Sequence, residues 1–303
     1  MNLASVEEVN LIKGEFAICS AKFFEQVTAF LVSSSMVELI DDKVISLDGS
    51  VASLASGSKI ESKFHVVCNG AATSSLLSNY NVLPIFQGVG TALTISSDTL
   101  QYGSDLVVRT VNRGGAQCGI HIVPRANGTH YIGAGNYLAQ FDEREDHRFE
   151  TVRYLIETVE QDIIGSKNTY NCRGSLLMGK RPRSFDGWPI FGPLQSQPNI
   201  IVASGWNRIG FSLAPLIANE IVGIIKHDKI DHIDGWLPDR EPLSFGTEKE
   251  CAEFFAASRC ANLIEHKLLD PSSEDYVNKY QELYSYSVAV NQTLTQKLRL
   301  DQV

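Results

Sequence analysis

The chain has 303 residues, with 26 basic and 35 acidic side chains and a formal net charge of −9. This surplus of acidic groups argues against nonspecific binding to nucleic acid or to an anionic membrane, because both need a basic surface. No apolar run approaches the ~20 residues that span a bilayer. The six cysteines are scattered without a C-x-x-C pair, which predicts reduced thiols in a cytoplasmic protein and no metal site.

The first predicted element is a helix over residues 20–31. Phe23, Phe24, Val27 and Phe30 recur there at helical spacing, and we expect them to form one buried face.

Short strands separated by Gly, Ser and Asp follow through residues 36–68, with a turn at Asp48-Gly49. The last of these strands ends in the small-residue turn Asn69-Gly70-Ala71-Ala72.

Residues 84–146 are rich in β signals. The sequence Arg125-Ala126-Asn127-Gly128 between two β-rich runs predicts a hairpin, because Asn and Gly tolerate positive φ. Apolar residues at helical spacing predict a helix over residues 146–164.

A strand over residues 199–203, a glycine-bearing loop over 204–210 and an apolar helix over 211–226 come next. This arrangement directs free backbone N–H groups of a helix N-terminus toward a polar or anionic ligand atom. Two more helices are predicted in the tail, the first opened by a capping box at Thr247 and Glu250.

The stretch from Gly174 to Arg181 nearly matches a phosphate-binding G-x-x-x-x-G-K-[ST] loop, but Arg181 replaces the hydroxyl that binds magnesium. We therefore reject a nucleoside triphosphatase. Arg181 and Arg183 flank Pro182, and two rigid guanidinium groups on a restricted backbone suit the binding of a carboxylate.

Four separated motifs resemble, in order, the D-amino-acid oxidase/glycine oxidase (DAO) superfamily of FAD-dependent oxidoreductases. The resemblance covers roughly residues 14–225. Its motifs are the strand and turn of Lys63–Leu77, the hairpin of His121–Ala134, the G-x-R-P and D-G-x-P-x-x-G-P sequences of Gly179–Pro193, and Gly205–Gly210 followed by Leu213-Ala214-Pro215.

The resemblance implies an α+β fold with three parts. Residues 1–82 and 171–228 would form an incomplete FAD-binding α/β lobe, residues 83–170 an antiparallel substrate-domain sheet, and residues 229–303 a helical extension. The implied reaction is hydride transfer from a carbon next to nitrogen, in an amino acid or related amine, onto the flavin of FAD.

The family's motifs also imply site residues. Arg181 would bind the substrate carboxylate. The residues that would approach the cofactor are Gly70, Ala71, Ala72, Gly205, Trp206, Asn207, Arg208, Ile209 and Gly210.

The chain departs from the family's pattern at one point. The family begins with a strand, a G-x-G-x-x-G loop and a helix that hold the FAD pyrophosphate, and neither Gly88-Val89-Gly90 nor Gly133-Ala134-Gly135 completes that motif. The chain thus resembles a truncated member whose missing βαβ unit is covered by a partner chain or by a second copy in a homo-oligomer. Two alternatives stay open: a flavin-free remnant that acts as a binding or scaffold module, and an unrelated α+β enzyme that uses Arg181 and Arg183 on an acidic ligand.

Overall fold

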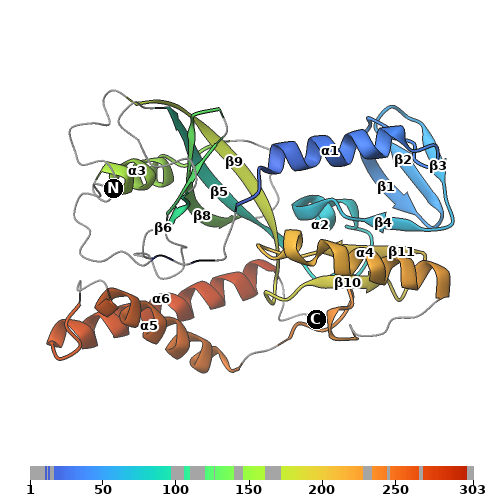
Figure 1. Cartoon of the computed structure of the whole chain (residues 1–303). Coiled ribbons are helices and arrows are strands. Elements are labelled where there is room, and N and C mark those ends of the chain that lie inside the picture. The colour runs from blue at the N-terminus through green and yellow to red at the C-terminus, as the bar shows by residue number, and fades with distance from the viewer. Residues whose placement is uncertain are drawn as a thin grey trace.

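The computed structural model describes residues 11, 13, 17–96, 106–109, 120–125, 127–139, 146–160, 172–227, 234–243, 246–265 and 269–298. Antiparallel sheets and a C-terminal pair of helices confirm the predicted α+β class (Figure 1). The helices are α1 (Ser20–Ser33), η1 (Gly70–Ala72), α2 (Thr73–Leu76), α3 (Phe149–Thr158), α4 (Gly210–His227), η4 (Asp234–Trp236), α5 (Glu248–Glu265) and α6 (Glu274–Leu298). The strands are β1 (Val44–Asp48), β2 (Val51–Leu54), β3 (Lys59–Glu61), β4 (His65–Val67), β5 (Ile85–Ser96), β6 (Val108–Arg109), β7 (His121–Pro124), β8 (His130–Ala139), β9 (Arg173–Ser184), β10 (Ile190–Pro193) and β11 (Ile200–Ser204).

The first lobe is built around the sheet β10-β11-β4, in which β11 pairs antiparallel with β10 and parallel with β4. All five residues of β11 are buried, as expected for a strand covered on both faces. Ile200 and Val202 pack with Leu47 of the small β1-β2-β3 sheet. Ile201 packs on the opposite face with Ile217 of α4.

The second lobe is an antiparallel sheet in the order β6-β7-β8-β5-β9. The predicted hairpin is confirmed, because β7 and β8 pair with Pro124 opposite His130. Helix α3 packs Leu155 and Val159 against Ile122 and Ile132 of this sheet. The predicted helix therefore forms, and Ile163 of its expected apolar stripe lies outside the described residues.

The strands β5 and β9 connect the two lobes. They pair over their whole length, from Ile85 opposite Ser184 to Ser96 opposite Arg173. Ile85 is buried in the core of the first lobe and Ile95 in the core of the second. Figure 1 shows this long ribbon running from the sheet beside α3 to the region of α4.

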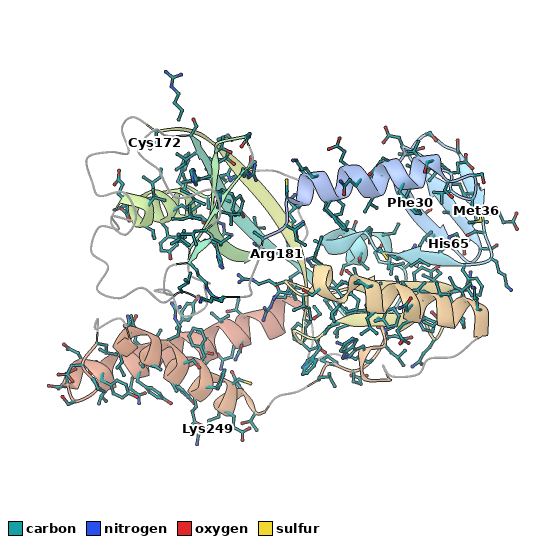
Figure 2. All side chains as sticks on the ribbon, viewed as in Figure 1. Phe30, Met36, His65, Cys172, Arg181 and Lys249 are labelled. Atoms are coloured by element: carbon teal, nitrogen blue, oxygen red, sulfur yellow. The ribbon has the colours of Figure 1, made fainter. Side chains whose placement is uncertain are left out.

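Helix α1 forms over Ser20–Ser33 as predicted, but the expectation that its apolar face is buried is wrong. Phe24 is 58% exposed and Phe30 is 71% exposed, and no residue of α1 is buried. The physical reason is that no described segment covers this side of the helix. Phe23 contacts the ring of Phe211 of α4, with the ring centroids 5.1 Å apart. Phe30 lies toward the outer end of α1 (Figure 2).

Residues 234–243 are fastened to the first lobe by a buried ion pair. One guanidinium nitrogen of Arg240 lies 2.9 and 3.0 Å from the two carboxylate oxygens of Asp186, and both side chains are almost completely buried. Asp186 also accepts hydrogen bonds from the N–H groups of Trp188 and Leu243. The turn at Asp186-Gly187 therefore anchors a distant part of the chain.

The C-terminal helices α5 and α6 pack on each other as a hairpin. The capping box forms as predicted, because the Thr247 N–H donates to the Glu250 carboxylate at 2.7 Å and the Glu250 N–H donates back to the Thr247 hydroxyl. These hydrogen bonds hold the pKa of Glu250 below its usual value. In the described ranges no helix is long and apolar enough to cross a membrane. The domain boundaries at 82, 170 and 228 stay a prediction.

Candidate functional site

Arg181 is positioned by the pairing of β9 with β5. It lies opposite Gly88, and its guanidinium group lies across Gly90 two residues further along β5. A Cβ atom on Gly90 would lie 2.7 Å from the nearest guanidinium nitrogen. The missing side chain at Gly90 therefore leaves the space that Arg181 occupies, which sequence analysis did not anticipate for Gly88-Val89-Gly90.

The loop after β11 is held against β9. The Asn207 N–H donates to the Pro182 carbonyl at 2.8 Å, and the Ile209 N–H donates to the Trp206 carbonyl at 3.0 Å to close a tight turn. Asn207 has a φ of 49°, a left-handed conformation that Asn adopts more easily than most residues. These bonds fix the backbone that carries Arg208 close to the backbone next to Arg181.

Trp206 is supported from two sides. Its ring centroid lies 6.3 Å from that of Phe191 and 6.1 Å from that of Trp236. A Cβ on Gly210 would lie 3.1 Å from the Trp206 Cβ, so the first residue of α4 packs closely beneath this side chain. The indole therefore has a well-defined place at the start of α4.

Both elements open onto one cavity of about 520 Å³. Arg181 and Pro182 of β9 line it together with the loop, and the second lobe contributes His121 of β7 and Tyr131 of β8. Arg181 is labelled in Figure 2 at the centre of the molecule, where β9 passes between the lobes. The cavity therefore lies where the lobes meet.

Most of the predicted loop residues line this cavity, namely Trp206, Asn207, Arg208 and Gly210 together with Arg181. Sequence analysis missed His121 and Tyr131. The only signal for them was their place in the hairpin that resembled the family's substrate domain.

The predicted turn Gly70–Ala72 is not among the described residues that line the cavity, but it is bonded to the base of the loop. The buried Ser204 hydroxyl donates to the Gly70 carbonyl at 3.0 Å, and the Thr73 hydroxyl lies 3.1 Å from the Ser204 hydroxyl. The parallel pairing of β4 with β11 brings both turns to the same sheet edge. The structure thus links the two motifs without placing them in one cavity wall.

The described cavity walls combine cations with aromatic and apolar groups and include no carboxylate. Within the described ranges, no group of three His, Cys, Asp or Glu side chains could hold a metal ion. The site's own side chains are suited to binding and orienting an anionic molecule.

A sequence profile of the DAO family, described as FAD dependent oxidoreductase, matches residues 14–223. The chain belongs to the DAO family. The alternative of an unrelated α+β enzyme is therefore wrong. Arg183, the second arginine of that alternative, is not among the described residues of the cavity wall. No curated protein sequence is significantly similar to the chain.

Solved structures of DAO-type enzymes share the fold. Glycine oxidase from Geobacillus kaustophilus is 19% identical with a TM-score of 0.54, and the match covers 66% of this chain and 52% of that one. Iminodiacetate oxidase from Chelativorans sp. BNC1 is 15% identical with a TM-score of 0.57, over 74% and 59% of the two chains. L-proline dehydrogenase from P. horikoshii is 18% identical with a TM-score of 0.56, over 72% and 59%. The matches thus cover between about half and three-fifths of these enzymes.

The DAO-family residues of this chain fit one end of FAD. The aromatic and apolar cavity wall and the N-terminus of α4 suit a flat, polar-edged ring system such as the flavin. The two Gly-x-Gly sequences do not supply the pyrophosphate loop, because Gly88–Gly90 lies inside β5 and Gly133–Gly135 inside β8. Among the described residues, the cavity wall has the residue types that a flavin ring needs, and neither Gly-x-Gly sequence forms a dinucleotide-binding turn.

Proposed function

We propose that this chain forms the flavin-ring and substrate-binding part of an FAD-dependent oxidoreductase that oxidises the C–N bond of an amine bearing a carboxylate. Its family membership supports the use of FAD. The observation that carries the proposal is the single cavity in which Arg181, the Trp206–Gly210 loop and the second lobe meet. The solved relatives named for glycine, iminodiacetate and L-proline act on amines with a carboxylate, which supports this substrate class.

Each part of the cavity has a role in this proposal. Arg181 binds the substrate carboxylate through a charge-assisted pair of hydrogen bonds. The loop of Trp206–Gly210 and the start of α4 would hold the pyrimidine edge of the ring, where the helix N-terminus would stabilise negative charge. Gly70, Ala71 and Ala72 approach the cofactor from the neighbouring turn. Bound FAD would supply the hydride acceptor for oxidation of the C–N bond, and the residues named here would bind and orient the substrate beside it.

We further propose that a partner chain supplies the βαβ unit that holds the pyrophosphate of FAD, or that a second copy of this chain covers the surface which that unit would occupy. The support for this is exposed apolar surface on two helices of the first lobe: Phe30 of α1 is 71% exposed and Leu216 of α4 is 52% exposed. In the described sheet β4 lies at the edge, with Val66 40% exposed. A parallel strand and its helix would cover these groups. A cytoplasmic location stays part of the proposal.

The test is the visible absorption spectrum of the purified protein after it has been mixed with excess FAD and gel filtered. Flavin bands that stay with the protein and bleach on addition of an amine with a carboxylate would support the proposal. A colourless protein would favour the second candidate, a flavin-free binding module, which the strand positions of both Gly-x-Gly sequences also favour.

A further inference from the structure

The cavity concentrates positive charge in an acidic protein. The chain carries a net charge of −9, yet the described cavity wall holds Arg181 and Arg208 and no acidic side chain. A cleft lined by one sign of charge between apolar walls strengthens the local potential and favours ligands of the opposite sign. The cavity is therefore suited to an anion. Because its wall holds two arginines, a ligand with two anionic groups would match its charge better than a ligand with one.

The two arginines come from different elements. Arg181 is fixed by the β5–β9 pairing, with its guanidinium across Gly90. Arg208 lies in the turn closed by Ile209 N–H to the Trp206 carbonyl, so its backbone is fixed while its exposed side chain stays long and adjustable. Two cations on separate supports can bind two anionic groups of one ligand.

A further cation lies behind the opposite wall. The guanidinium carbon of Arg125 lies 5.5 Å from the ring centroid of Tyr131, which itself lines the cavity. Arg125 adds positive potential on the side of the second lobe without being part of the described wall. One carboxylate bound by Arg181 would leave the charge of Arg208 unmatched by the ligand.

We propose that the substrate carries two anionic groups, one bound by Arg181 and the other by Arg208. This inference rests on the proposed function and narrows it to amines with two carboxylates, such as an N-carboxyalkyl or acidic amino acid. It moves Arg208 from the predicted cofactor contacts to the substrate side. An anionic group of FAD is the other source of negative charge that Arg208 could bind, so the test has to separate the two.

The experiment measures ligand binding to the full chain without and with FAD, by calorimetry and by quenching of tryptophan fluorescence, since Trp206 lines the cavity. The probes are iminodiacetate and N-methylglycine, which are both secondary amines and differ by one carboxylate. We expect the wild-type protein to bind iminodiacetate at least tenfold more tightly. Arg208→Gln should abolish this preference, because it weakens the binding of iminodiacetate far more than that of N-methylglycine, whereas Arg181→Gln should weaken both ligands.

Arg183→Gln is the matched control, because it removes the same charge from β9 at a residue outside the described cavity wall, and both affinities should stay as in the wild type. Thermal denaturation checks that each variant is folded. A wild-type protein without the preference, or one that binds neither probe, overturns the inference. So does an Arg208→Gln variant that keeps the preference while losing FAD retention, because Arg208 would then bind the cofactor. Failure of the proposed function has a different signature: the preference persists, but no flavin is retained or reduced.

Discussion

Replacing Gly90 with alanine tests whether the position of Arg181 determines carboxylate binding. The new Cβ would lie 2.7 Å from one guanidinium nitrogen and 3.1 Å from the other. The nearer nitrogen has to move by about 0.7 Å to reach 3.4 Å, where ordinary contact begins. Because the displaced group is the end of a flexible side chain, the change should alter the guanidinium position at little cost to folding.

The expected effect on binding follows from the hydrogen bonds at stake. A hydrogen bond to a charged group contributes roughly 1.5–3 kcal/mol, so loss of one of a pair should weaken binding of N-methylglycine about 10- to 150-fold. Calorimetry on Gly90→Ala measures this directly. The free energy of unfolding should stay within about 1 kcal/mol of wild type, because alanine in a strand also restricts the unfolded chain.

Gly179→Ala is the control for this experiment. Gly179 lies opposite Gly90 in the β5–β9 pairing, and a Cβ there would meet no atom within 4 Å. It should therefore bind N-methylglycine as the wild type does. Equal affinities for the Gly90→Ala and Gly179→Ala variants would refute the reasoning that the space above Gly90 positions Arg181 for a carboxylate.

Three other predictions concern stability and association. Arg240→Met leaves the buried Asp186 carboxylate without its cation and should lower the free energy of unfolding in urea by about 3–5 kcal/mol. Lys279→Met removes an exposed ion pair and should lower it by less than ~1 kcal/mol. Similar losses in the two variants would contradict the importance of burial. Burial lowers the pKa of His130, so below pH ~6.5 the unfolded state binds a proton that the folded state does not. The free energy of unfolding of the wild type should therefore fall by up to about 1.4 kcal/mol per pH unit relative to that of His130→Gln. Parallel stability profiles of the two proteins from pH 7.5 to 5.5 would contradict this. If the exposed face of α1 contacts a second copy, Phe30→Asp should weaken self-association about tenfold in sedimentation experiments. This factor corresponds to ~1.5 kcal/mol for burial of one ring. A wild-type protein that stays monomeric at high concentration would count against that contact.

Local sequence signals predicted the parts of the site that lie within one short segment. The loop of Gly205–Gly210 is such a segment, because a strand, a positive-φ turn and a helix follow one another directly in the chain. Arg181 was recognisable for the same reason, since it adjoins a proline within a motif.

Features that depend on distant pairing could not be predicted. His121 and Tyr131 reach the cavity only through the order of strands in the second sheet, and the role of Gly90 depends on its register against β9. The ion pair of Asp186 with Arg240 joins residues 54 apart in the chain. The exposed face of α1 was mispredicted because helical spacing identifies an apolar face but not the segment that covers it.

The β5–β9 ribbon has a mechanical consequence for the cavity. Each strand is 12 residues long, and their pairing continues from one hydrophobic core into the other. The paired strands therefore form a continuous, stiff connection at the junction of the lobes. A swing of one lobe away from the other would have to break consecutive backbone hydrogen bonds next to Arg181. The strand that carries Arg181 should therefore be held more firmly than the turn that carries Arg208.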